Sequence, residues 1–159
     1  MTARLNTFAT PVGAKVTKYL VGASHALHAG TVPVLTLHLV EIRASQINGC
    51  AFCVDMHAKD AAVAGETPAR LTMVAAWREA TCFTEAERAA LELAEAGTRL
   101  ADGAGVPDDV WANAAEHYDE DQLATLVMQI ALINAFNRAN VMVRQPGGDY
   151  VPGQFDAMK

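Results

Sequence analysis

Two helices and the turn between them are predicted by one stretch, Ile42-Arg43-Ala44-Ser45-Gln46-Ile47-Asn48-Gly49-Cys50-Ala51-Phe52-Cys53-Val54-Asp55-Met56-His57. The Asn48-Gly49 pair is a typical helix end, because both residues tolerate the left-handed backbone that follows a last helical turn. The next helix then begins near Cys50. Cys50, Cys53 and His57 are three and four residues apart, so they share one face of that helix.

The dithiol of Cys50 and Cys53 is the predicted working centre. A thiol at a helix N-terminus faces unpaired backbone N–H groups, which favour the thiolate and lower the thiol pKa. Two cysteines at this spacing can approach within bonding distance, so one thiolate can attack while the other closes a disulfide. His57 lies one turn beyond Cys53 and Asp60 extends the same face. The pattern therefore predicts a redox centre served by His57.

Other interpretations of these residues remain open. Cys50, Cys53 and His57 could supply three ligands to zinc, with His38 as a fourth. No second CxxC or paired-histidine motif follows, which disfavours zinc. The cysteines could also be small apolar core residues. A thioredoxin-type domain is disfavoured because that fold needs βαβ units, and the sequence shows none.

The preceding helix carries a second group of candidate residues. His38, Glu41 and Ser45 are three and four residues apart and share a face. The hairpin at Asn48-Gly49 could turn that face toward the dithiol, where a carboxylate or imidazole could orient His57 or pass a proton. Alternatively, Glu41 is an ordinary solvated charge and His38 an ordinary core or interface histidine.

The rest of the chain also shows helical patterns without period-two alternation, so we predict an all-α fold with no sheet. The whole chain, 1–159, is expected to form one domain, because its length allows one sizeable core. An arm over 1–13 and an irregular tail from residue 145 are expected at the ends. Caps, glycines and prolines predict helices over 15–28, 33–47, 50–65, 67–78, 84–103, 107–117 and 120–143.

Charge and composition disfavour several classes of protein. The net charge is -6 and no basic stripe is present, which argues against nucleic acid as a partner. We find no signal peptide and no run of about 18 apolar residues, so we expect no membrane span and a cytoplasmic location. In that reducing compartment a close cysteine pair is more often catalytic or metal-binding than structural. Cys82 falls in a predicted loop and is interpreted as non-catalytic.

The 42–57 stretch resembles the carboxymuconolactone decarboxylase-like family, in its alkylhydroperoxidase D-like branch. The 133–138 segment and the 144–148 ending are similar to that branch as well. The resemblance implies an all-α fold built around a helical hairpin and assembled as trimers or hexamers. It also implies peroxide reduction by a CxxC dithiol with a glutamate–histidine proton relay. By this resemblance Cys50 and Cys53 match the redox cysteines, and His57 matches the relay histidine.

Two positions depart from the family pattern. The family's relay glutamate usually lies twelve residues before the first cysteine, and here that residue is His38. We hypothesise that His38 takes its place in positioning His57, with Glu41, one turn later, as the alternative if the helices are rotated or shifted. The alkylhydroperoxidase itself also has a histidine where this chain has Phe52. The decarboxylase branch generally lacks the CxxC pair, so lactone decarboxylation is disfavoured.

We therefore predict a dithiol-dependent peroxidase in which Cys53, one turn from His57, attacks a small organic hydroperoxide. Cys50 is the alternative attacking thiol because it lies nearer the helix N-terminus. The sulfenic acid would condense with the other cysteine, and an external dithiol or protein reductant would reset the pair. Phe52 and Met56 could line an apolar approach. No cofactor is expected, and the alternatives are a non-catalytic oligomeric redox-sensing or binding protein and a zinc-binding structural protein.

A homo-oligomer is predicted from the last helix, 120–143, which is apolar around most of its circumference. Such a helix must be buried, and one small domain has limited room to cover it, so neighbouring subunits are expected to do so. A central core helix within one subunit is the alternative. The apolar residues are Leu123, Leu126, Val127, Ile130, Ile133, Phe136 and Val141.

Overall fold

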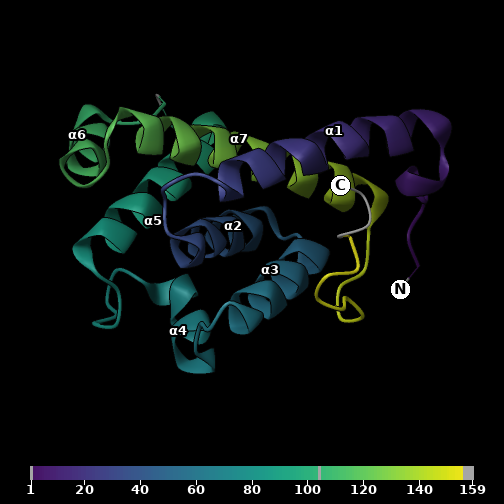
Figure 1. Ribbon diagram of the computed structural model, residues 1–159, viewed down its shortest axis with the longest axis horizontal. Helices are drawn as coiled ribbons and strands as arrows, with labels where there is room; N and C mark the ends of the chain where they lie inside the picture. Colours follow the sequence, from purple (N-terminus) through teal and green to yellow (C-terminus); the bar gives the residue numbers. More distant parts are fainter. Residues whose placement is uncertain (1, 104, 156–159) are drawn as a thin grey trace.

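The computed structural model describes residues 2–103 and 105–155, and these residues form seven α-helices, three short 3-10 helices and no strand (Figure 1). The predicted all-α class is therefore confirmed. The helices are α1 Pro11–His28, α2 Val34–Asn48, α3 Ala51–Val63, α4 Pro68–Met73, α5 Glu85–Thr98, α6 Asp108–His117 and α7 Glu120–Val143.

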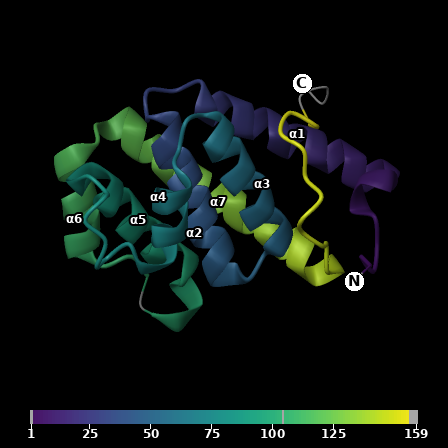
Figure 2. The same cartoon turned by 90° about the horizontal axis from the view of Figure 1, so that it is seen from below.

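Helix α2 is the central element, and it packs against α3, α5 and α7. Figures 1 and 2 both show it enclosed by its neighbours, with α1 running along α7 on the outside. A helix covered on nearly every side needs no polar face, which explains why Leu37, Leu39, Val40 and Ile42 are all buried. Polar residues on α2, Glu41 among them, are buried with them and must find partners inside the protein.

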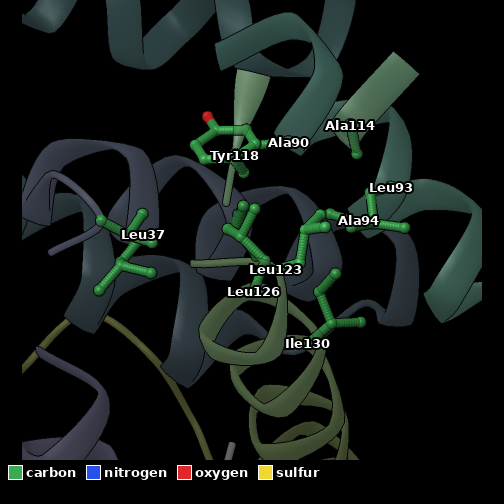
Figure 3. Close-up of a cluster of buried hydrophobic side chains, with 11 residues drawn as sticks. Leu37, Ala90, Leu93, Ala94, Ala114, Tyr118, Leu123, Leu126 and Ile130 are labelled. Carbon is green, nitrogen blue, oxygen red and sulfur yellow. The ribbon is translucent and has the colours of Figure 1, made fainter. Parts of the chain in front are cut away.

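The apolar core has three parts. One lies where α2, α5, α6 and α7 meet, and Figure 3 shows Leu37, Leu93, Leu126 and Ile130 converging there. A second packs α2 and α5 against α3, α4 and the segment that follows α4, and includes Trp77. The third surrounds the cysteine pair. These clusters hold α2 in a fixed register against α3 and α7.

Local capping explains where the helices begin. Thr84 and Glu87 form the predicted capping box at the start of α5. The arm predicted over 1–13 is wrong beyond residue 10, because the Thr10 side chain accepts a hydrogen bond from the N–H of Gly13 and α1 already begins at Pro11. Proline suits the first helical position because its missing N–H would have no partner there.

Two predicted helices are shorter than expected. The fourth ends at Met73 rather than 78, and it continues as a 3-10 turn over Val74–Ala76. The fifth ends at Thr98 rather than 103, and another 3-10 turn, Leu100–Asp102, follows Thr98 closely. The last turn of a helix often tightens into a 3-10 turn. Because the apolar pattern continues through such a turn, the sequence does not show where the α-helix ends.

Helix α7 is long and apolar enough to cross a membrane by length and composition. That is a weak indication, because core helices of soluble proteins pass the same test. Leu123, Leu126, Ile130 and Ile133 of α7 are buried within this subunit, as the core-helix alternative predicts. Val127 and Val141 are exposed. The helix also buries polar residues that bond to other helices, which marks it as a core element.

Candidate functional site

The cysteine pair lies at the start of α3, as predicted. Gly49 takes the left-handed conformation with φ 68°, and Cys50 is the N-cap of α3 rather than its first residue. Its sulfur accepts a hydrogen bond from the Cys53 backbone N–H at 3.3 Å. Cys50 and Cys53 form a disulfide, and both are buried, whereas Cys82 is free and exposed.

The α2–α3 hairpin brings Glu41 against His57. Nδ1 of His57 lies 2.9 Å from Oε2 of Glu41, and Nδ1 of His38 donates a hydrogen bond to the same oxygen, also at 2.9 Å. The His38 and His57 rings are 6.3 Å apart between centroids. The structure therefore places Glu41, rather than His38, in contact with His57. His38 reaches His57 only through that carboxylate.

Glu41 is a buried anion. It is 1% exposed, its Oε1 accepts a hydrogen bond from Gln129 Nε2 at 2.6 Å, and Nε2 of His28 lies 3.7 Å from the same oxygen. Burial by itself raises the pKa of this carboxyl. The neighbouring imidazoles of His57, His38 and His28 outweigh burial and hold the pKa of Glu41 well below its usual range. The carboxylate is therefore charged at neutral pH and can stabilise a protonated imidazole.

Helix α7 contributes amide side chains that sequence reasoning missed. Asn140 Nδ2 donates to the sulfur of Cys53 at 3.4 Å, and Gln129 holds Glu41 as described above. Asn137 Nδ2 donates to Ser45 Oγ, whose hydroxyl donates to the Glu41 carbonyl. The sequence contained a signal for them, because these amides recur on one face of an otherwise apolar helix. A polar group buried on such a face needs a partner.

A cavity of about 620 Å³ opens beside Cys53. Cys53 and His57 line it and Cys50 does not, while Phe52 and Met56 lie on its wall as predicted. Leu132, Ile133 and Phe136 of α7 add apolar lining, whereas α1 contributes mainly polar residues, His25 and His28 among them. A small apolar molecule in this cavity would lie next to one sulfur of the pair and one imidazole.

The chain beyond α7 closes one side of this cavity. Asp60 also lines the cavity, and its carboxyl accepts hydrogen bonds from the Tyr150 hydroxyl at 2.9 and 3.0 Å. Burial raises the pKa of Asp60 despite that contact. Asp55 accepts from the N–H groups of Gly148 and Tyr150, and Lys59 donates to the carbonyls of the same two residues. Gly148 and Tyr150 of the predicted irregular tail are thus bound along α3, while residues 156–159 of that tail lie outside the described residues.

The cluster suited to a metal differs from the zinc set considered above. Cys50 and Cys53 are bonded to each other, which removes them as ligands in this state. Among the described residues, His28, His38 and Glu41 have ligand atoms that all lie within 4.8 Å of one another. His28, on α1, was not identified from the sequence, because nothing local links α1 to the CxxC segment.

The chain is similar to several known proteins. A model of the carboxymuconolactone decarboxylase family matches residues 14–96. Uncharacterized protein YdfG of Bacillus subtilis (strain 168) is 46% identical over 106 residues, which are 67% of this chain and 71% of YdfG. ATU0492 from Agrobacterium tumefaciens, a protein of unknown function described as a candidate antioxidant defence protein AhpD, matches with a TM-score of 0.86 and 31% identity. That match covers 94% of this chain and 100% of ATU0492.

A more distant solved structure shows the fold alone. The debrominase Bmp8, in complex with 2,3,4-tribromopyrrole, matches with a TM-score of 0.76 and 18% identity, covering 92% of this chain and 78% of Bmp8. The family match spans more than half of the chain, and the relatives agree with it. The chain, with its AhpD-like helical fold and CxxC pair, belongs to the carboxymuconolactone decarboxylase family.

Proposed function

We propose that the protein is a dithiol-dependent peroxidase that reduces small organic hydroperoxides. One observation carries the proposal: the buried Glu41 carboxylate contacts His57, which lies on the wall of the same apolar cavity as Cys53. A base with a fixed negative charge behind it is the arrangement that activates a thiol nucleophile.

The chemistry starts from the reduced pair. His57 takes the proton of the Cys53 thiol, and the charge of Glu41 stabilises the imidazolium that forms. The thiolate attacks the terminal peroxide oxygen, the O–O bond breaks, and the leaving alkoxide takes the proton from His57 to become an alcohol. Cys53 is then a sulfenic acid, which the thiol of Cys50 attacks to form the disulfide and release water. An external dithiol reduces the disulfide and is itself oxidised.

Cys53 is proposed as the attacking residue because it lines the cavity and Cys50 does not. The Asn140 amide donates toward its sulfur and would also stabilise a thiolate there. Cys50 is proposed to resolve the sulfenic acid, a role that its disulfide with Cys53 supports. The same arrangement would serve a redox sensor, and steady turnover separates the two functions.

The test measures consumption of cumene hydroperoxide with dithiothreitol as reductant. Wild type should turn over steadily, and Cys53→Ser should lose activity together with formation of sulfenic acid. Cys50→Ser should still form the sulfenic acid, which a trapping reagent would detect, but should not complete the cycle. Cys82→Ser is the matched control and should behave as wild type. A single oxidation without further turnover would favour the redox sensor, and activity in Cys53→Ser would contradict the assignment.

We also propose a homo-oligomer that works in a reducing compartment such as the cytoplasm, where dithiol reductants are present. Val127 and Met128 of α7 and Val12, Val16 and Tyr19 of α1 are large apolar residues left exposed on the subunit. Exposed apolar surface of this kind is common at subunit interfaces. No nucleic acid or membrane partner is proposed.

A further inference from the structure

His28 faces Glu41 with the ring nitrogen that does not contact the Ser24 carbonyl. Its Nδ1 lies 2.9 Å from the carbonyl oxygen of Ser24, and because a carbonyl only accepts, Nδ1 must carry the hydrogen. The other nitrogen, Nε2, then presents a lone pair toward Glu41 Oε1 at 3.7 Å. Two electron-rich atoms that face each other repel unless a proton or a metal ion lies between them.

The donor set around this point matches a divalent transition metal. His28, His38 and Glu41 offer two imidazoles and one carboxylate, with ligand atoms all within 4.8 Å of one another. In tetrahedral coordination, bonds of about 2.1 Å place two ligand atoms about 3.4 Å apart, so the most distant pair must close by at most about 1.4 Å. Imidazole with carboxylate is a set that zinc and similar ions prefer, whereas magnesium and calcium favour oxygen ligands alone.

The surroundings supply what a metal site requires beyond its ligands. The Ser24 carbonyl orients His28, and Gln129 Nε2 orients the carboxylate of Glu41. Such outer contacts hold ligands in most protein metal sites. His57 is 8% exposed, and neither of its ring nitrogens makes a hydrogen bond of good geometry, although Nδ1 lies 2.9 Å from Glu41 Oε2. The cavity beside the three ligands leaves room for a small exogenous ligand.

We propose that His28, His38 and Glu41 form a binding site for a divalent transition metal of the Zn²⁺ type, which joins α1 to α2 at the cavity wall. Binding does not depend on the peroxidase function, because the ligands exclude both cysteines. The ion and the proposed proton relay use the same carboxylate, so a bound ion withdraws Glu41 from His57.

The experiment titrates the metal-free disulfide form with Co²⁺ and follows the visible absorption of bound cobalt, with Zn²⁺ binding measured by calorimetry. Holding the protein in the disulfide form prevents thiolates from binding the ion. Wild type should bind one ion. His28→Ala should weaken binding at least about tenfold, since even outer contacts of metal sites are worth about 10–100-fold.

His25→Ala is the matched control, because His25 lies one turn earlier on α1 and lines the same cavity but is outside the cluster. It should bind as wild type does. His38→Gln, with its fold checked by circular dichroism, should lose binding like His28→Ala. The proposal is overturned if the disulfide form shows no cobalt spectrum, if binding appears only after reduction of the cysteines, or if His25→Ala and His28→Ala weaken binding equally.

Discussion

Replacing Glu41 with glutamine removes the charge at the centre of the histidine cluster and keeps the shape of the side chain. The two oxygens of Glu41 accept hydrogen bonds from Gln129 and His38 in a position that is 1% exposed. Glutamine has one oxygen, so its amide nitrogen must face one of those donors. A buried donor left without an acceptor costs about 1–3 kcal/mol. At roughly 2–4 °C for each kcal/mol, Tm should fall by about 2–12 °C.

The effect of Glu41→Gln on turnover should be larger than its effect on folding. Once His57 takes the proton of Cys53, no negative charge remains beside the imidazolium, and the thiolate fraction falls. General base catalysis contributes about 10²–10⁴-fold to rate, so we expect kcat/KM for cumene hydroperoxide to fall at least about 10²-fold. Titration of the thiols in the reduced protein should show a smaller thiolate fraction at neutral pH.

Glu95→Gln is the matched control, since Glu95 is another buried glutamate, held by Arg43, Arg78 and Trp77 away from the cavity. It should lower Tm and leave turnover near wild type. His38→Ala keeps the Glu41–His57 contact and should slow turnover less than Glu41→Gln. Wild-type turnover in Glu41→Gln, or a greater loss in His38→Ala, would refute the assignment of Glu41 and return the relay to the position that the family pattern suggests.

Other predictions concern stability and assembly. In Gly147→Ala the new methyl carbon would lie 2.5 Å from the Ala51 carbonyl oxygen, so the tail must shift. We expect the free energy of unfolding, followed by thermal denaturation, to fall by about 1–3 kcal/mol. An unchanged Tm would mean that the tail is not held there. Burial raises the pKa of Tyr118 to about 12 from 10.0, so the unfolded chain ionises first and the free energy of unfolding falls as pH rises through that interval. In urea unfolding, the stability of Tyr118→Phe should not fall over this pH interval. An equal fall in wild type and in Tyr118→Phe would assign the effect to another group. Light scattering should find a trimer or hexamer, and a stable monomer at micromolar concentration would contradict the proposed assembly.

Short-range signals in the sequence were sufficient for most of the fold. Helix ends follow from the residue at the cap and its neighbours within one turn, which is why Gly49, Thr84 and the start of the last helix were predicted correctly. The spacing of Cys50 and Cys53 on one helix start is equally local, and the disulfide follows from it. The family is visible in the same stretch.

The partners of the dithiol were decided by tertiary structure. Periodicity put His38 and Glu41 on one face of α2, but one helical turn separates them, and only the register of α2 against α3 decides which of them contacts His57. His28 and Asn140 reach the centre from α1 and α7, far away in sequence. A local sequence pattern does not show the axial register in which one helix packs against another, because that register depends on the fit of many apolar side chains at once.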